Sequence, residues 1–478
     1  MLFSSMMFLW IFLPVVLVVN YLLGRIKTRD ITSRIQYKNI FLLIASLIFY
    51  AWGGFYYLFL ILSVILINYI AGLLISRAVS NKKTLLTVTI AANILIIGYF
   101  KYFNLLIHTI ESIAGREAGA FGLKEVILPI GISFFIFQAM SYVIDVYWGK
   151  TDCQKNLAYF ALYVALFPQL IAGPIVQYKD VAAQLHDRSE NTSKFVSGIR
   201  RFTFGLAKKV LIANIMGDVV DKIWSADIGS MYASVAWFGM IAYTLQIYYD
   251  FSGYSDMAIG IGRMLGFEFK ENFNMPYTSL SIKEFWRRWH ISLSSWFRDY
   301  VYIPLGGSRK GDKLTYRNLF IVFLLTGIWH GANYTFFFWG LYYAFFIIIE
   351  RAFLGDLLEK NRCKFINYIY AILVVMVGWV FFRADSIGDA FVFLGGLCRF
   401  SGKGISIFEY LNFKVLLAFL VGIFLSCPVW SRIKTKMGIT EGITEVSIPS
   451  FVLQMILLLL SMMMLISGSY NPFIYFQF

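Results

Sequence analysis

Two of the four histidines in this chain, His290 and His330, directly follow a tryptophan in strongly apolar sequence, and the run around His330, residues 319–339, contains no charged residue. A titratable group at membrane depth indicates function, because burial removes hydration that something else must replace. A buried imidazole is held neutral, and its ordinary pKa of about 6.5 suits it to take a proton from an attacking hydroxyl. A core histidine bonded to a backbone carbonyl is the alternative interpretation for both. The other two, His108 and His186, fall in or beside polar loops and are expected at the surface.

The sequence around His290 crowds charged and aromatic side chains together. Glu284 and Arg288 are four residues apart, so on a helix they can form an ion pair, and Trp286 and His290 share another face at the same spacing. A tight basic loop, residues 304–311, follows this stretch. Such a loop beside a buried histidine could receive an anionic donor.

The composition is that of a membrane protein. Hydrophobic residues make up 59% of the 478 positions and charged residues 14%, and the mean hydropathy is +0.69. A soluble protein needs a more polar surface, so we predict an all-α polytopic integral membrane protein whose apolar runs cross a hydrocarbon core of about 30 Å. We expect a single integral-membrane domain over residues 1–478. The formal charge of +15 is explained by Lys and Arg in short cytoplasmic loops, so no nucleic-acid partner is expected.

Apolar runs recur along the whole chain and predict membrane helices. Residues 195–224 carry basic residues at near-helical spacing, which predicts either an amphipathic helix on the cytoplasmic face or a short span. The basic loops place the C-terminal tail, residues 469–478, outside the cytoplasm. A long span is expected from about residue 233, and the other expected helices cover residues 1–23, 39–52, 55–75, 84–107, 128–148, 336–350, 366–382, 411–428 and 449–467.

One apolar stretch, residues 157–178, is interrupted by Pro168 and by the pair Gly173-Pro174. Proline removes a backbone donor and breaks a helix. Broken backbone at membrane depth is tolerated only where protein buries it or a wet cavity solvates it. We therefore expect this segment to be covered by other parts of the protein.

Asp250 and Ser252 are polar residues inside another apolar stretch, residues 249–256, and must face other protein groups because lipid offers them no partner. Familiar catalytic and metal motifs are missing: the chain has no GxSxG elbow, HExxH helix or P-loop, and its four cysteines are far apart with no CxxC pair. We expect no metal site, no disulfide framework and no bound cofactor.

Two motifs surround the histidines: Glu-Phe-Trp-Arg-Arg-Trp-His-Ile-Ser-Leu-Ser-Ser-Trp-Phe-Arg-Asp-Tyr-Val-Tyr-Ile-Pro-Leu-Gly-Gly at residues 284–307, and Gly-Ile-Trp-His-Gly-Ala-Asn at residues 327–333. Both resemble the signature of the membrane-bound O-acyltransferase (MBOAT) family. The similar subgroup is bacterial, the membrane subunit of alginate O-acetylation and its relatives for cellulose and peptidoglycan. The resemblance covers nearly the whole chain and continues through residues 128–135, 167–174 and 249–260.

The resemblance implies an MBOAT-type ring of transmembrane and re-entrant helices around a central tunnel in the bacterial plasma membrane. It implies that His330 is essential for acyl transfer and that His290 is the second, more variable histidine. The implied partners are membrane lipid, a cytoplasmic acyl-thioester donor, which we expect to be acetyl-coenzyme A, and an extracytoplasmic polysaccharide acceptor. The other residues that we expect to contact substrates are Trp286, Arg287, Arg288, Trp289, Trp329, Asn333, Asp250 and Ser252.

The chain ends in Pro-Phe-Ile-Tyr-Phe-Gln-Phe, residues 472–478. This ending resembles the C-terminal motif of the small partner peptide in D-alanylation of teichoic acids, which implies that Tyr475 carries the acyl group. Tyr475 would then pass it to a separate extracytoplasmic transferase of the SGNH type or similar, a covalent relay through a side-chain oxygen. An aromatic anchor at the membrane interface is the alternative.

Two other functions stay open at this point. One is D-alanyl transfer to teichoic acid, whose membrane component is shorter and depends on a separate carrier peptide. The other is a polytopic transporter or flippase for envelope glycans, which would favour two matched halves with broken helices in corresponding positions. The fused tail and the crowded Trp-His motifs favour acetyl transfer over both.

Overall fold

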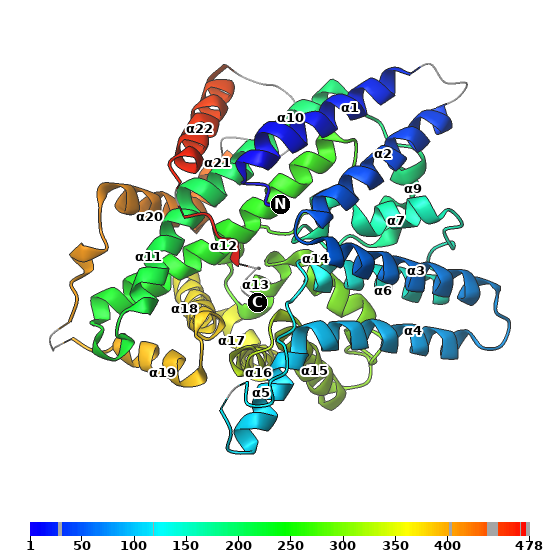
Figure 1. The fold of residues 1–478 in the computed structure, drawn as a ribbon. Helices are drawn as coiled ribbons and strands as arrows, with labels where there is room; N and C mark the ends of the chain where they lie inside the picture. Colours follow the sequence, from blue (N-terminus) through cyan, green and yellow to red (C-terminus); the bar gives the residue numbers. More distant parts are fainter. Residues whose placement is uncertain (27–30, 118, 401–403, 437–447, 469, 475–478) are drawn as a thin grey trace. The chain divides into compact units, whose positions relative to one another are not determined.

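The computed structural model describes residues 1–26, 31–117, 119–400, 404–436, 448–468 and 470–474. Every regular element within these residues is helical, and none is a strand (Figure 1). Six described helices are long and apolar enough to cross a membrane: Phe8–Arg25, Phe55–Arg77, Lys82–Ile113, Tyr334–Lys360, Lys364–Arg383 and Ile448–Ile466. The predicted class, an all-α polytopic membrane protein, is confirmed.

The described residues group into two compact units. Unit 1 contains residues 1–202 and 257–270, and unit 2 contains residues 203–256 and 271–478. That both belong to one functional domain stays a prediction. The elements of unit 1 are η1 (Phe8–Phe12), α1 (Leu13–Arg25), α2 (Ile31–Ala51), α3 (Phe55–Arg77), α4 (Lys82–Ile97), η2 (Gly98–Tyr102), α5 (Phe103–Ile113), α6 (Ile132–Tyr147), α7 (Leu157–Ala165), α8 (Phe167–Leu170) and α9 (Tyr178–His186).

Two helices, α10 (Thr192–Ala207) and α12 (Ala233–Met264), contribute residues to both units. The remaining elements of unit 2 are η3 (Lys208–Ala213), α11 (Asn214–Ser225), η4 (Ile228–Ser230), η5 (Pro276–Thr278), α13 (Ile282–Arg288), α14 (Ile291–Phe297), η6 (Arg298–Tyr302), α15 (Asp312–His330), α16 (Tyr334–Ile349), η7 (Glu350–Leu354), α17 (Gly355–Lys360), α18 (Lys364–Arg383), α19 (Ile387–Gly396), η8 (Ile407–Glu409), α20 (Phe413–Ser426), α21 (Pro428–Lys436) and α22 (Ile448–Ile466).

In unit 1, helix α6 is buried along its length except for its last two residues. It begins after Gly131, which has a φ of 76° and where a Cβ would lie 2.6 Å from the carbonyl oxygen of Leu170. Only glycine tolerates both this backbone conformation and this close approach. The crossing helix predicted over residues 128–148 is therefore a shorter, 16-residue helix enclosed by protein.

The interrupted stretch of unit 1 folds as α7, the single turn α8 and an extended segment that leads to α9. Its free backbone groups are satisfied by side chains, as broken backbone requires. The Tyr163 hydroxyl lies 3.0 Å from the carbonyl oxygens of both Gln138 and Val176, and Ser46 Oγ accepts from the Phe167 N–H at 3.1 Å. The prediction that protein covers this break is confirmed.

In unit 2, helices α15 and α16 pack through small residues. A Cβ at Gly327 would lie 2.4 Å from the Phe336 carbonyl oxygen, and one at Gly340 would lie 2.6 Å from the Phe323 carbonyl oxygen. Small residues let helix backbones approach this closely. The apolar run at residues 319–339 is thus two helices joined by a short break, and His330 is the last residue of the first.

Residues 192–225 form one helical run through α10, η3 and α11. This run is not one of the six candidate spans, and the choice between an amphipathic helix and a short span stays a prediction. The predicted span at residues 411–428 is also shorter than expected, because α20 has 14 residues.

Candidate active site

Helix α13 leads into the first Trp-His motif and is held at its N-terminus by two caps. The first backbone N–H groups of a helix have no partner within the helix, and a carboxylate near them is favourable. Ser281 Oγ accepts from the Glu284 N–H at 3.1 Å. The buried Glu350 carboxylate, which follows α16, accepts from the N–H groups of Ile282 and Lys283 at 2.6 and 2.9 Å. These bonds fix α13 relative to the end of α16.

Both residues of this Trp-His motif, Trp289 and His290, lie in the break between α13 and α14. Helix α13 ends at Arg288, and His290 has a φ of 43°, a left-handed conformation that is uncommon for a residue other than glycine. The predicted ion pair between Glu284 and Arg288 is confirmed at 2.8 Å. The prediction that Trp286 and His290 share a helix face is wrong, because the helix does not continue to His290.

His290 is buried, with 1% of its surface exposed, and Asn272 fixes its tautomer. Asn272 Oδ1 accepts from the Ser292 N–H at 3.2 Å, and a backbone N–H can only donate, so this atom is the amide oxygen. The same oxygen lies 3.1 Å from His290 Nδ1, which must therefore carry a proton. Nε2 then carries the lone pair of the neutral ring, and it is the atom that can take a proton.

The protonation state of His290 follows from its surroundings. It lies outside the six candidate spanning helices, and burial lowers its pKa to about 3. Its ring packs edge-on against Phe251, with centroids 4.6 Å apart. Water is excluded from such a site, so the imidazole is neutral at physiological pH.

His330 lies in an aromatic box. Its ring centroid is 5.0 Å from that of Trp329, 5.0 Å from that of Trp339 and 5.1 Å from that of Phe382, each in an edge-to-face arrangement. The next residue is Gly331, where a Cβ would lie 2.1 Å from the Phe336 ring. The chain can turn away from His330 only because this position has no side chain.

Trp329 contacts both histidine rings, since its centroid lies 6.0 Å from that of His290 and 5.0 Å from that of His330. The two motifs that are about forty residues apart in sequence thus meet around one indole. Among the described residues, the Nε1–H of Trp339 has no hydrogen-bond partner, although the residue is fully buried. This donor belongs to a ring that packs beside His330.

The remaining predicted tryptophans belong to the same aromatic layer. The Trp286 ring packs against Trp339 at 5.6 Å and Tyr343 at 4.9 Å. The Trp289 ring packs against Trp379 at 4.8 Å. Both therefore build the wall behind the histidines, and whether they contact substrate stays a prediction.

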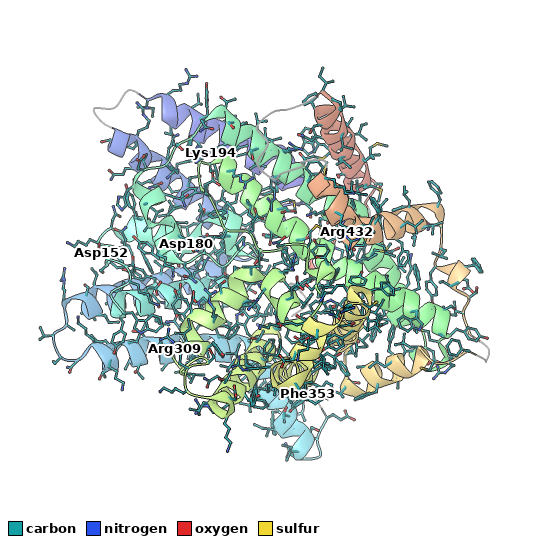
Figure 2. All side chains as sticks on the ribbon, turned by 180° about the vertical axis from the view of Figure 1, so that it is seen from behind. Asp152, Asp180, Lys194, Arg309, Phe353 and Arg432 are labelled. Atoms are coloured by element: carbon teal, nitrogen blue, oxygen red, sulfur yellow. The ribbon has the colours of Figure 1, made fainter. Side chains whose placement is uncertain are left out.

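The predicted polar residues near the histidines include one exposed residue, Arg287, and two that have partners in the fold, Arg288 and Asn333. Arg287 is exposed, whereas Arg288 is paired with Glu284 and also donates to the Asn274 carbonyl oxygen at 3.3 Å. Asn333 caps α16 by accepting from the Thr335 N–H at 3.1 Å, and its Nδ2 donates to the Asp385 carbonyl oxygen. Arg288 and Asn333 thus have structural bonds of their own. In the basic loop, residues 308–311 are exposed, and Figure 2 labels Arg309.

Asp250 and Ser252 lie on α12, and both are buried. Asp250 forms an ion pair of 2.7 Å with Lys209 and accepts from the Ile474 N–H at 2.8 Å. Ser252 Oγ has no hydrogen-bond partner within the described part of the chain. The third predicted catalytic residue, Tyr475, lies outside the described residues, although Ile474 is inside them.

Comparison with known proteins identifies the chain. The sequence model of the membrane-bound O-acyltransferase family matches residues 154–387. A protein of Pseudomonas putida named probable alginate O-acetylase AlgI is 41% identical, with 100% of both chains covered. The chain belongs to the membrane-bound O-acyltransferase family. It is therefore an enzyme, an O-acyltransferase, and a multi-pass protein of the bacterial plasma membrane.

Two further MBOAT relatives differ in the names that they carry. A peptidoglycan O-acetyltransferase of Helicobacter pylori is 34% identical over 84% of this chain and 80% of its own. A teichoic acid D-alanyltransferase of Bacillus subtilis is 28% identical over 45% of this chain and 57% of its own. Both the identity and the coverage are higher for the acetyltransferases.

Three residues of this MBOAT site were missed by the sequence analysis: Asn272, Trp339 and Glu350. Two of them act on residues far away in sequence, since Asn272 lies 18 positions before His290 and Glu350 lies 68 positions after Ile282. The one available signal was a lone acid, Glu350, at the end of an apolar run. Within the described residues, no group of three or more His, Cys, Asp or Glu side chains could hold a metal ion.

Proposed function

We propose that the protein transfers an acetyl group from a cytoplasmic thioester, acetyl-coenzyme A, for O-acetylation of an extracytoplasmic polysaccharide. The observation that carries this proposal is the contact of Trp329 with both buried histidine rings, in a chain of the MBOAT family. The names of the relatives from Pseudomonas putida and Helicobacter pylori support acetyl as the group and a glycan as the acceptor.

In this proposal His330 is the general base. The acceptor hydroxyl gives its proton to the imidazole while its oxygen attacks the thioester carbonyl, and a tetrahedral intermediate forms. The intermediate then collapses, the carbon–sulfur bond breaks, and the thiolate takes the proton back from the imidazolium. A general base of this kind contributes about 10²- to 10⁴-fold in rate.

Two neighbours of His330 support this role. The buried Nε1–H of Trp339 is a donor only, which suits it to the negative charge that develops on the carbonyl oxygen. His290 is a supporting residue on the acceptor side, because Asn272 holds its Nδ1 protonated and leaves Nε2 as the acceptor atom. The exposed Arg287 is free to meet the anionic part of the donor.

The acetyl group is proposed to leave the site on the chain's own end. Tyr475, in the extracytoplasmic tail at residues 469–478, would supply the attacking hydroxyl at His330 and carry the acetyl group as a phenyl ester. A separate SGNH-type or similar transferase would move it from Tyr475 to the polysaccharide. The predicted ring of helices around a central tunnel belongs to this proposal, since it lets the acetyl group cross while the anionic carrier stays in the cytoplasm.

The test compares cells with the wild-type protein, with His330→Ala and with His186→Ala, an exposed histidine that serves as the control. Envelope polymer is isolated and treated with mild base, and the released acetate is measured. We expect His330→Ala to lose nearly all acetate while the amount of polymer and the level of protein stay constant. Equal acetate from His330→Ala and wild type would refute the proposal.

The same preparations discriminate the alternatives. Release of D-alanine in place of acetate would indicate D-alanyl transfer, whereas loss of the polymer itself would indicate a transporter or flippase. Tyr475→Phe tests the relay separately, because it keeps an aromatic anchor and removes the nucleophile. Normal acetylation in Tyr475→Phe would refute the relay and leave the role of His330 intact.

A further inference from the structure

The last described residues of the chain, 470–474, are inserted into unit 2. Phe473 and Ile474 are 1% and 3% exposed. Chain ends are poorly ordered unless something ties them down. In Figure 1 the red segment after α22 runs alongside the green helices α11 and α12.

The backbone of this segment is bound by a buried ion pair. Lys209 Nζ donates to the Pro472 carbonyl oxygen, and Asp250 Oδ2 accepts from the Ile474 N–H at 2.8 Å. The same two side chains pair with each other at 2.7 Å, and each is 3% exposed. The Ile474 N–H and the Pro472 carbonyl oxygen are therefore bound by opposite members of the same ion pair.

Side chains of the segment have their own partners on the same helices. Asn471 Oδ1 accepts from Asn214 Nδ2 at 3.1 Å, and the Phe473 ring lies 4.7 Å from that of Tyr254. The Tyr470 hydroxyl donates to the Asp221 carboxylate. A Cβ at Gly217 would lie 2.9 Å from the Tyr470 ring, so the helix leaves space for this ring by having no side chain there.

The buried ion pair between Lys209 and Asp250 indicates a specific binding site for residues 470–474 rather than ordinary core packing. A buried ion pair is a weak source of stability by itself, because the desolvation of both charges offsets their attraction. It becomes favourable when its remaining hydrogen-bonding capacity is used, as the segment's backbone uses it here. The adjacent pair Lys208–Asp256, at 2.6 Å, gives a contrast, since Lys208 is 33% exposed.

We propose that Lys209 and Asp250 form a receptor for the chain's own C-terminal segment, residues 470–474, and so fix the point from which the last four residues start. In this role both are positioning residues, and Asp250 binds the tail in place of a diffusible substrate. The functional consequence rests on the proposed relay, because the bound segment leads directly to Tyr475. The binding itself does not depend on the relay.

The test measures hydrogen–deuterium exchange of the amides in residues 470–474, using the full-length protein in lipid nanodiscs. The double variant Lys209→Met/Asp250→Leu replaces the pair with apolar side chains and leaves no unpaired charge. The matched control is Lys208→Met/Asp256→Leu, which removes the neighbouring pair. We expect exchange about 10- to 100-fold faster in the first variant, from the loss of hydrogen bonds to charged groups, and wild-type exchange in the control.

A second variant changes the tail alone. Ile474→Pro removes the N–H that Asp250 accepts, and Ile474→Val keeps it. Faster exchange of the remaining amides is expected for the proline variant only, even if the double variant fails to fold. Exchange at the wild-type rate in Ile474→Pro, or in a folded Lys209→Met/Asp250→Leu, would overturn the receptor.

Acetate release from the same variants keeps the two proposals distinguishable. A released tail with lost acetylation supports both the receptor and the relay. A released tail with normal acetylation supports the receptor and refutes its contribution to acetyl transfer, whereas the relay itself is refuted by normal acetylation in Tyr475→Phe.

Discussion

The tautomer of His290 should be controlled by Asn272, and Asn272→Asp tests this. The substitution is nearly isosteric, and the carboxylate can accept from the same three donors: the Ser292 N–H, the Ser292 hydroxyl and His290 Nδ1. These donors favour the ionised carboxylate. A negative charge would then lie beside a ring that is neutral in the wild type.

The expected shift can be worked from the structure. Asn272 Oδ1 lies 3.1 Å from His290 Nδ1, so the charge centres would be about 4 Å apart, and at an effective dielectric constant of about 20 their attraction is about 4 kcal/mol. This corresponds to about 3 pKa units. The pKa of His290 should therefore rise from about 3 to about 6 in the variant.

The assay is nitrogen NMR of protein labelled with ¹⁵N-histidine, which is practical because the chain has four histidines. Wild-type His290 should keep a protonated Nδ1 and an unprotonated Nε2 from pH 8 to pH 5, because the whole range lies at least about two units above its pKa. In Asn272→Asp, Nε2 should become protonated as the pH falls through about 6. Acetate transfer should fall as Nε2 becomes protonated, by about fourfold between pH 7.5 and pH 5.5.

The control is Asn274→Asp, which adds the same charge two residues away at an exposed position. It should leave the His290 signals unchanged. The reasoning would be refuted by a wild-type His290 that carries its proton on Nε2, or that titrates at its ordinary pKa. An unchanged midpoint in Asn272→Asp would refute the electrostatic part alone.

Three further predictions follow from other contacts. Trp339→Phe keeps an aromatic ring beside His330 and removes the unpartnered N–H, so acetate transfer should fall by about 10²- to 10³-fold. Thermal stability should fall only modestly, because the smaller ring leaves a small cavity at a fully buried position. An activity near wild type would remove Trp339 from the oxyanion role. Gly327→Ala places a Cβ 2.4 Å from the Phe336 carbonyl oxygen and should reduce the free energy of unfolding by about 1–3 kcal/mol, measured as a loss of thermal stability. The control Gly98→Ala has no atom within 4 Å of the new Cβ and should not destabilise the protein. Arg287→Ala should raise KM for the thioester donor, because this exposed side chain is proposed to meet the donor's anionic part. Arg288→Ala removes a half-exposed ion pair, so it should lower the free energy of unfolding by at most about 1 kcal/mol and leave KM unchanged. Equal effects of the two variants on KM would contradict the assignment of donor binding to Arg287 alone.

The architecture was predictable where the sequence signal was strong and local. The break in residues 157–178 and the ion pair of Glu284 with Arg288 were predicted because proline and i,i+4 spacing act within a few residues. Helix ends were less predictable. Residues 128–148 contain a shorter helix because Gly131 packs against the carbonyl of Leu170, a contact that no local pattern reveals.

The two histidines were found by their chemistry, but their environment was not. The helical spacing placed His290 on a face with Trp286, whereas the chain actually turns left-handed at His290, where Asn272 bonds to the ring and to the next turn. Asp250 was predicted to face other protein groups because lipid offers a carboxylate no partner, and this is confirmed, but the sequence did not reveal which groups these are. Its observed partners are Lys209 and the backbone of the chain's own end.

Apolar composition and breaker residues were enough to predict a helical membrane protein, because they act through neighbouring residues, and the resemblance of the Trp-His motifs to the MBOAT family implied an acyltransferase. Three features became visible only in the packed chain: Trp329 contacts both histidines, Asn272 sets the tautomer of one of them, and a buried ion pair binds residues 470–474. Each of these depends on groups far apart in the chain. A buried polar group needs a hydrogen-bond partner, and these groups become buried only once the helices have packed. The partners therefore depend on the tertiary structure.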